Sequence, residues 1–329
     1  MEITLDGSRF EYRTCYQEES GLRGSFNDLA KTVFGLDFEA WHRAGYWTDR
    51  YRPYSLVREG KVVANVSVSP MDLRCMGKEL HYLQIGTVMS DPAERGRGLI
   101  HFLMARVLTD WKGKCDGIYL FANRETLEFY PRFGFTKARE FRHTLPVQPS
   151  EGKGATVRRL IPELSQDKAL LLKSCQKGNP YGLLQWEHNP GLLFFHCGGA
   201  LREHVYYLPQ YDLVAVAEYD GSTLYCHELL GPRGPELEEV LSALARPETE
   251  KAVLGFTPRA GSRCSVRPLL GGETLFTLGS TGDLFPRYQM RFPTLSHPCE
   301  RTRTTLLGGP GFGIFERKIC HTMQPVYCF

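Results

Sequence analysis

In the first half of the chain, the spacing of hydrophobic residues is first typical of helices and then typical of strands. Apolar residues spaced three to four apart predict two amphipathic helices, over residues 21–34 and 38–47. Apolar and polar residues then alternate, which predicts a β-hairpin over residues 54–68 with its turn at residues 59–61. Residues 80–89 continue the alternation as a strand. Its buried face is predicted to be Leu83, Ile85, Thr87 and Met89, with Tyr82, Gln84 and Gly86 on the other face.

A helix and a second strand follow, and with residues 80–89 they form a strand–helix–strand unit. Residues 98–112 carry one wide apolar stripe that includes Leu103 and Val107, and residues 118–122 are an apolar run with the length of a buried strand. This order implies a parallel crossover connection. A shorter helix is predicted over residues 125–132, ending at the sequence Phe-Gly-Phe.

The second half repeats this order weakly. Its elements are a predicted hairpin with strands at residues 212–217 and 223–229, a helix near residues 235–245 and a strand at residues 252–256. We therefore predict a first domain at residues 1–146, a glycine- and proline-containing linker at 147–155, a second domain at 156–298 and an unassigned tail at 299–329.

Composition and charge narrow the class of protein. The chain has 329 residues, of which 42% are hydrophobic and 23% charged, as in a globular protein of about two domains. Its net charge of +3 is too small for a nucleic-acid or membrane-surface partner. No basic, apolar leader opens the chain, and no apolar run approaches the ~18 residues of a membrane span.

The ten cysteines are scattered without a C-x-x-C pair, and the His–Cys neighbours do not have metal-ligand spacing. We expect no metal, reduced thiols and a cytoplasmic location.

The segment between the strand and the helix carries the candidate chemistry. It reads Asp-Pro-Ala-Glu-Arg-Gly-Arg-Gly over residues 91–98. Gly96 and Gly98 allow a ligand to approach the backbone, and the first helical turn presents unpaired N–H groups. With Arg95 and Arg97 beside it, this segment is a candidate phosphate cradle. The alternative is an ordinary strand-to-helix turn with solvated arginines.

Two motifs resemble the GNAT superfamily of N-acetyltransferases. The first is Arg95-x-x-Gly98-x-Ile100, similar to the family's Gln/Arg-x-x-Gly-x-Gly/Ala, from which Ile100 departs. The second is residues 123–135, which resemble its Asn-x-x-x-x-x-Phe-Tyr-x-x-x-Gly-Phe region. The resemblance covers residues 54–141. It implies an α/β GNAT fold, with a mixed, splayed central sheet flanked by helices. The second half would be a degenerate GNAT-like domain, as in tandem-domain bacterial acetyltransferases of the enhanced-intracellular-survival type.

The resemblance also implies acetyl-CoA as the donor and co-substrate. The pantetheine arm would pair with the strand end at Val88 and Met89, and Asn123 would bond the cofactor arm or cap a helix, or do both. The pyrophosphate would lie on the backbone amides of Arg95, Gly96, Arg97, Gly98, Leu99 and Ile100.

Tyr130 is the residue that the resemblance makes catalytic, as hydrogen-bond donor to the departing sulfur. A tyrosine pKa of about 10 and a thiol pKa of about 8.5 make full proton transfer uphill by roughly 2 kcal/mol, so stabilisation of the thiolate is its first role. Packing beside Phe129 and Phe133 is the alternative. No general base is assigned, because the strand before the loop offers Gln84 and no carboxylate. A water chain or a carboxylate from the second domain stays open.

The predicted function is direct acetyl transfer to a primary amine, either a small amine or an aminoglycoside-like molecule. The alternative is a non-catalytic acyl-CoA-binding regulator. The second domain would be a wall of the acceptor pocket or a contact in a homo-oligomer. Aromatic and acidic residues of the first helices could bind a cationic amine or be core with a solvated rim: Trp41, Tyr46, Trp47 and Tyr51 beside Asp37, Glu39 and Asp49.

Overall fold

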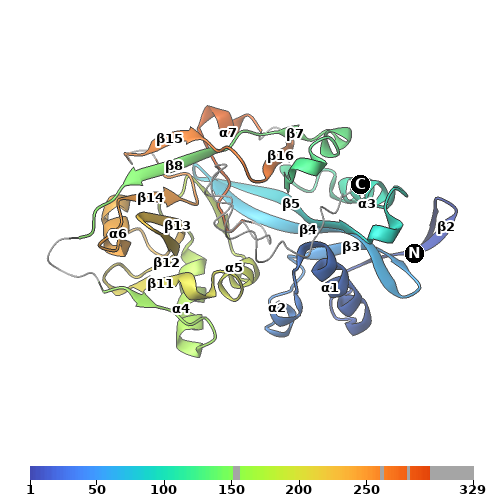
Figure 1. Cartoon of the computed structure of the whole chain (residues 1–329), viewed down its shortest axis with the longest axis horizontal. Coiled ribbons are helices and arrows are strands. Elements are labelled where there is room, and N and C mark those ends of the chain that lie inside the picture. The colour runs from blue at the N-terminus through green and yellow to red at the C-terminus, as the bar shows by residue number, and fades with distance from the viewer. Residues whose placement is uncertain (151–155, 260–262, 280–281, 297–329) are drawn as a thin grey trace.

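The computed structural model describes residues 1–150, 156–259, 263–279 and 282–296. It contains two mixed β-sheets with helices packed around them (Figure 1). The α/β class is therefore confirmed. The predicted tail at residues 299–329 and part of the predicted linker, residues 151–155, lie outside the described residues.

The first sheet contains the hairpins and the parallel unit that the alternating pattern predicts. Its pairs are antiparallel except for β5 and β6, which are parallel and are joined by α3 (Leu99–Trp111). Its strands in spatial order are β1 (Glu2–Leu5), β2 (Ser8–Thr14), β3 (Arg52–Arg58), β4 (Lys61–Cys75), β5 (Lys78–Ser90), β6 (Gly117–Ala122), β16 (Thr274–Leu278) and β7 (Thr136–Lys137), and β10 (Leu184–Glu187) pairs with the far end of β4.

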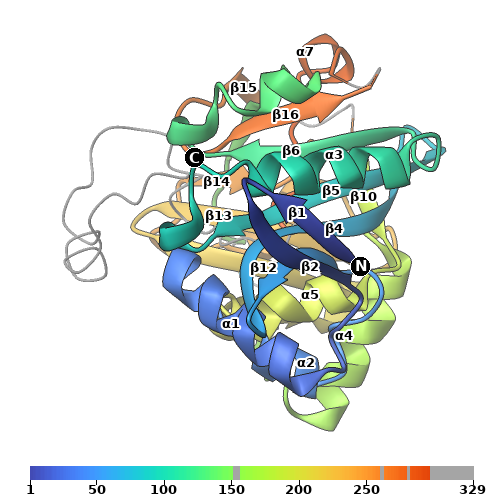
Figure 2. The same ribbon diagram turned by 90° about the vertical axis from the view of Figure 1, so that its right-hand side faces the viewer.

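Helix α3 covers one face of this sheet (Figure 2). Its buried side chains are Leu99, Leu103, Met104 and Val107, so the predicted apolar stripe is confirmed. The other predicted helices of this half are α1 (Ser20–Phe34) and the short α2 (Glu39–Arg43). The prediction that β5 buries only one of its faces is wrong, because Tyr82 and Gln84 on the other face are also buried, like Leu83 and Ile85. The second half of the chain covers that other face.

The helix predicted at residues 125–132 is also wrong. Two 3-10 turns replace it, at Arg124–Thr126 and Tyr130–Phe133. Pro131 explains the break, since it has no N–H to donate within a helix and disfavours the helical conformation of the residue before it.

The second sheet repeats the parallel unit. Strands β13 and β14 are parallel and are joined by α6 (Leu237–Leu244), whose apolar face packs on the sheet. Helices α4 (Ser165–Lys177), α5 (Pro190–Cys197) and α7 (Leu284–Arg287) complete this half. The strands in spatial order are β15 (Ser265–Pro268), β8 (Phe141–Pro146), β14 (Lys251–Leu254), β13 (Thr223–Leu230), β12 (Leu213–Asp220), β11 (Val205–Leu208) and β9 (Arg158–Arg159).

Each sheet includes one or more strands from the other half of the chain, and β10 on β4 is one of them. β8, from the first half of the chain, lies between β14 and β15 of the second sheet, and β16, from the second half, lies between β6 and β7 of the first. One apolar cluster also joins the halves, with Tyr82 and Tyr119 of the first sheet and Val214 and Val216 of the second. The predicted boundary at residues 147–155 stays a prediction, but each sheet is completed across it.

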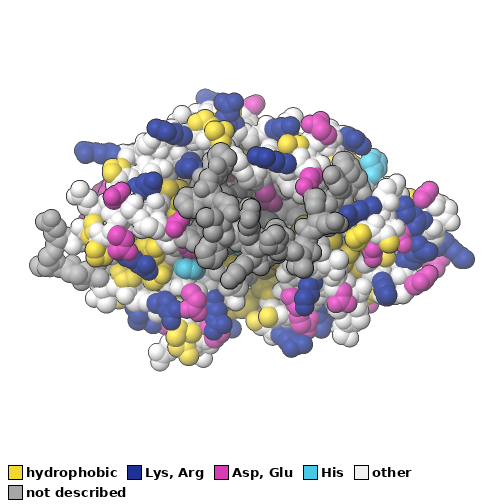
Figure 3. All heavy atoms as spheres, viewed as in Figure 1, with side chains coloured by type: hydrophobic (Ala, Val, Ile, Leu, Met, Phe, Trp, Pro, Cys, Tyr) yellow, Lys and Arg dark blue, Asp and Glu magenta, His cyan; other side chains and the backbone are white. Residues whose placement is uncertain are grey.

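On the surface, acidic and basic side chains are interspersed over the face shown in Figure 3, as the near balance of charge predicts. No helix in the described ranges has the length and apolar character needed to cross a membrane.

A buried carboxyl lies in the core of the second half. Glu228 is 1% exposed, and its Oε2 accepts a 2.8 Å hydrogen bond from Trp186 Nε1, while Asn179 and the Leu229 amide donate to Oε1. Burial raises the pKa of Glu228 to about 7, against the lowering effect of these donors.

We expect Glu228 to make the fold less stable as pH rises from about 4.5 to 7. Over that window the folded state holds a proton that the unfolded state has lost, so the free energy of unfolding should fall by about 3 kcal/mol and then level off. Urea unfolding from pH 5 to 8 measures this slope. Glu228→Gln should remove it, and Glu248→Gln, at an exposed site, should keep it. Equal slopes in all three proteins would contradict the assignment.

Candidate active site

Strands β5 and β6 pair over only part of their length. Their ladder runs from Tyr82–Gly117 to Ile85–Leu120, but β5 continues to Ser90 and β6 to Ala122. The sheet therefore splays beyond Ile85, as the resemblance implies. In the described part of the chain, no strand pairs with this last segment of β5 on the side of β6.

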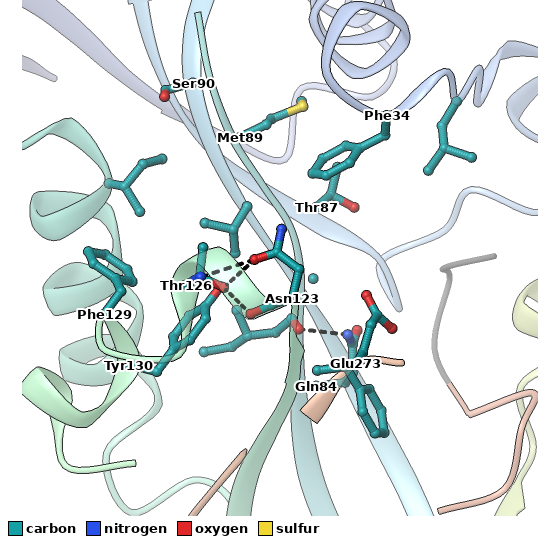
Figure 4. Close-up of a pocket in the computed structure, with 16 residues that line it drawn as sticks. Phe34, Gln84, Thr87, Met89, Ser90, Asn123, Thr126, Phe129, Tyr130 and Glu273 are labelled. Atoms are coloured by element: carbon teal, nitrogen blue, oxygen red, sulfur yellow. Dashed lines mark hydrogen bonds between the residues drawn. The ribbon is translucent and has the colours of Figure 1, made fainter. Parts of the chain in front are cut away.

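A pocket lies at this gap (Figure 4), and its empty space, counted together with the open solvent at its mouth, is about 980 Å³. Its lining is mostly apolar, with a few polar groups, as is usual for small-molecule sites. The lining residues come from both edges of the gap, from the two 3-10 turns and from the end of α1: Phe34, Leu36, residues 84–90, Ile100, Phe121, Asn123, Thr126, Phe129, Tyr130 and Glu273.

A β-bulge at Thr87 shapes the β5 edge of the pocket. Between its pairs with Ser67 and Asn65, β5 advances three residues, from Gly86 to Met89, while β4 advances two. Thr87 has φ +48°, a left-handed conformation that is strained for a β-branched residue. The bulge reverses the alternation of side chains, so that Val88 packs on the α3 side of the sheet and Met89 in the core beside α1, while both contribute to the pocket lining.

A buried polar network holds the bulge in place. Asn65 is fully buried, and its Nδ2 donates to the Thr87 carbonyl at 2.8 Å and to Ser67 Oγ at 2.9 Å. Its Oδ1 accepts from Ser55 Oγ at 2.8 Å, and the Tyr51 hydroxyl donates to Thr87 Oγ1 at 2.7 Å. Sequence reasoning missed Asn65, because a polar residue in a strand does not show whether it faces a core or a bulge.

The predicted phosphate cradle has the expected backbone. Gly96 and Gly98 have φ +77° and +72°, and apart from the glycine itself and its neighbours in the chain no described atom lies within 4 Å of where a Cβ would be on either residue. Gly98 is the N-cap of α3 and has no side chain to bond the first-turn amides. These amides and the positive end of the helix therefore face open space, where an anion can bind.

Arg95, in the loop before α3, has unsatisfied side-chain donors. Its Nε and Nη2 are buried and have no hydrogen-bond partner among the described residues. Buried guanidinium nitrogens without partners are costly, so this position suits an anionic ligand.

The Arg97 side chain does not lie beside the cradle as a free cation. It forms an ion pair with Glu94, another with Asp6 at 3.1 Å, and a hydrogen bond to Ser8. Arg97 therefore fastens the loop to the N-terminal hairpin, and only its backbone is left to face a ligand. Of the two helical residues after the cradle, Leu99 is buried in the core and Ile100 lines the pocket.

Asn123 and Tyr130 converge on the pocket from the segment after β6. Asn123 Oδ1 accepts from Thr126 N at 3.1 Å and from Thr126 Oγ1 at 2.8 Å, so the capping alternative is confirmed. Figure 4 shows its amide nitrogen on the side away from Thr126, facing the pocket. Tyr130 is 5% exposed and contacts the rings of Phe129, Phe135 and Phe276, which fix its orientation.

The aromatic residues of the first helices do not line this pocket. Trp47 and Tyr51 are buried in the core around α1. Trp41 donates to the Gly191 carbonyl at 2.8 Å, and Tyr46 stacks on Phe194 with centroids 4.3 Å apart. Trp41 and Tyr46 line a second pocket, between α2 and α5.

Comparison with known proteins agrees with this geometry. Residues 18–138 match the sequence model of a family described as acetyltransferase (GNAT) domain. No curated protein matches the chain.

Three solved structures share the fold over most of the chain. A conserved protein of unknown function from Enterococcus faecalis V583, described as a probable N-acyltransferase, has a TM-score of 0.56 at 16% identity, covering 84% of this chain and 74% of that one. A GCN5-related N-acetyltransferase from Kribbella flavida has 0.52 at 18%, covering 82% and 71%. Another from Anabaena variabilis ATCC 29413 has 0.50 at 16%, covering 82% and 72%.

The chain has a sheet that splays between two parallel strands, with a glycine loop leading into the helix that joins them, and it shares its overall fold with these solved structures. Residues 18–138 of the chain therefore match a GNAT acetyltransferase domain, and most of the chain shares the fold of the three solved structures.

Proposed function

We propose that the protein transfers the acetyl group of acetyl-CoA directly to a primary amine. The observation that carries the proposal is that three features follow one another. They are the cradle at Gly96 and Gly98, the end of β5 that has no described partner strand on the side of β6, and the pocket that includes Tyr130. Together they would bind a phosphate group, an extended amide-containing arm and a thioester, in that order.

The residues present fit acetyl-CoA. The amides of residues 95–100 and the Arg95 guanidinium would bind the diphosphate. The backbone at Val88 and Met89 would hydrogen-bond the pantetheine amides like an added strand, and Asn123 would donate to the same arm. Acetyl-CoA would supply the activated acyl group, and the protein would hold it away from water.

Tyr130 would act on the leaving group. Its hydroxyl would donate a hydrogen bond to the sulfur as negative charge develops there, in a mostly apolar pocket where such a bond is strong. The Tyr130 ring is held by three aromatic neighbours, so the donor would already be oriented before the reaction.

One observation favours the non-catalytic alternative. Gln84 occupies the buried β5 position where a carboxylate base could lie, and its Nε2 donates to the Ile85 carbonyl at 2.7 Å. An acyl-CoA-binding regulator would keep the cradle without turning over.

Calorimetry with acetyl-CoA, followed by an assay of CoA thiol release with a panel of primary amines, separates the two functions. The panel includes alkylamines, polyamines and aminoglycosides, because the proposal names a primary amine as the acceptor and each of these classes contains one. Binding with turnover supports the enzyme, and binding with no turnover on any amine supports the regulator. The absence of binding would overturn both.

A cytoplasmic location is also part of the proposal. The described cysteines are free thiols: Cys15, Cys75, Cys115, Cys175, Cys197, Cys226 and Cys264.

The bulge network offers a separate test of the pantetheine site. Asn65→Ala should lower the free energy of unfolding by about 2–4 kcal/mol, because it leaves buried Ser55, Ser67 and Thr87 groups without their partner. It should also weaken acetyl-CoA binding, since the Thr87 bulge would relax.

Asn27→Ala is the matched control, because Asn27 is 8% exposed and accepts one bond, from the Phe38 amide, outside the pocket. It should destabilise the fold and leave the affinity intact. If both variants bind acetyl-CoA like the wild type, the bulge does not form part of the site.

A further inference from the structure

We propose that Glu273, contributed by the second half of the chain through the exchanged strand β16, is the catalytic base that accepts the proton of the acceptor ammonium. This inference rests on the proposed acetyl transfer and names the missing group of that site. It also gives the strand exchange a function.

The register of β16 brings Glu273 to the mouth of the gap. Thr274 pairs with Ala122 in the antiparallel β16–β6 ladder, so Glu273 falls opposite Asn123, one step beyond the end of β6. Glu273 is partly buried and lines the same pocket as Asn123 and Tyr130. Figure 4 shows its carboxylate beside Asn123 and next to the Gln84 side chain.

Glu273 and Tyr130 approach the pocket from opposite faces of the sheet. Residues 273 and 275 of β16 project to one face, where Leu275 packs in the cluster shared with the second half. Tyr130 belongs to the cluster on the α3 face. An acceptor amine approaches one face of the planar thioester, whereas the sulfur lies in that plane and leaves the same carbon in a different direction. A base on one face and a hydrogen-bond donor on the other match that geometry.

The backbone that carries Glu273 is fixed on its C-terminal side by strand β16. β16 is hydrogen-bonded to β6 and β7, and its Leu275 and Phe276 are fully buried. Gly271 and Gly272, at φ +83° and +74°, make the turn that leads into the strand. Gln84 cannot take the same role, because an amide does not accept a proton at neutral pH and its Nε2 is already bonded to the Ile85 carbonyl.

The reaction balances with these two side chains. The ammonium R–NH3⁺ gives one proton to the Glu273 carboxylate, and the neutral nitrogen attacks the acetyl carbonyl carbon. The N–C bond forms and the C–S bond breaks with its electron pair on sulfur. Tyr130 donates its proton to the departing sulfur and regains one from water. The nitrogen gives its second proton to water, and Glu273 then releases the first, so that one proton is released overall.

An alkylamine has a pKa of about 10.4 and is almost wholly protonated at neutral pH, so it needs such a base. An arylamine nitrogen is already neutral at that pH and does not. The dependence of the reaction on Glu273 should therefore follow the basicity of the acceptor.

The opposing interpretation is a surface ion pair. Arg124, Lys137 and Arg139 line a neighbouring hollow on the other side of Glu273, and they could hold its carboxylate as a structural contact. Such a contact would affect stability but not the chemistry of one class of acceptor.

The test uses the full chain with Glu273→Gln and, as control, Glu128→Gln. Glu128 lies beside the pocket residue Phe129, but its own side chain is 88% exposed and outside the pocket lining. The readouts are acetyl-CoA affinity by calorimetry, thermal stability, and kcat/KM for the alkylamines of the panel and for an arylamine.

Glu273→Gln should lower kcat/KM for alkylamines by about 10²–10⁴-fold and change the arylamine rate and the acetyl-CoA affinity by less than about threefold. The control should match the wild type throughout. Equal losses with both amines, or no loss, would overturn the role of Glu273 and leave the proposed function standing. Wild-type binding of acetyl-CoA without turnover of any amine would overturn both.

Discussion

Tyr130→Phe should lower kcat for acetyl transfer by about 10²–10³-fold and leave acetyl-CoA affinity unchanged. The phenol would bond the sulfur only as charge develops there, so its loss should act on the transition state and not on the bound ground state. The phenylalanine ring keeps the contacts with Phe129, Phe135 and Phe276, and thermal stability should therefore change little.

Tyr82→Phe is the matched control for this prediction. Tyr82 is 5% exposed and its hydroxyl has no hydrogen-bond partner among the described residues. It lies on β5 in the core cluster shared by both halves. The control should keep the wild-type kcat. A Tyr130→Phe enzyme that also keeps it would exclude Tyr130 from the chemical step and favour a packing role.

Gly98→Asp should lower acetyl-CoA affinity by at least about 100-fold. Two like charges 4 Å apart repel by about 4 kcal/mol at an effective dielectric of 20, and the new carboxylate would lie at the position proposed for the diphosphate. A side chain at φ +72° also strains the loop that presents the amides. Calorimetric titration with acetyl-CoA measures the loss.

Gly113→Asp separates the charge effect from the strain. Gly113 follows the other end of α3, has φ +70° and has equally open space around it. Both variants place a side chain at positive φ, but the helix dipole favours a carboxylate at residue 98 and disfavours one at residue 113. Gly113→Asp should therefore be the less stable variant and should still bind acetyl-CoA like the wild type. Equal affinities in both variants would show that the diphosphate does not bind at the N-terminus of α3.

The sequence predicts the elements around the cradle well because local signals determine them. The alternation of apolar and polar residues predicts β3 to β5, and the apolar stripe predicts α3. Gly96 and Gly98 indicate a backbone with positive φ. Pro131 could have corrected the helix predicted at residues 125–132, because a proline interior to a helix breaks it.

Other parts of the site depend on contacts between distant segments. A threonine gives no sign of positive φ, so the Thr87 bulge follows only from its bonds to Asn65 and Tyr51. An apolar run also does not reveal the sheet it joins. The strand exchange, and with it the position of Glu273, therefore becomes visible only in the fold.

The second half shows why a repeated fold need not repeat the site. The segment before α6 contains Pro232 and Pro235, which have no N–H to offer a phosphate. The first turn of α6 carries Glu238 and Glu239, whose charges would repel one. Both features support a degenerate second domain whose contribution to the site is β16.

A crystal structure of the full chain with acetyl-CoA would show directly whether the cradle, the end of β5 and Tyr130 form one binding site. We expect the diphosphate on the amides of residues 95–100, the pantetheine arm along the end of β5, and the thioester sulfur within hydrogen-bond distance of the Tyr130 hydroxyl. A nucleotide bound in the pocket between α2 and α5, or a thioester remote from Tyr130, would contradict it.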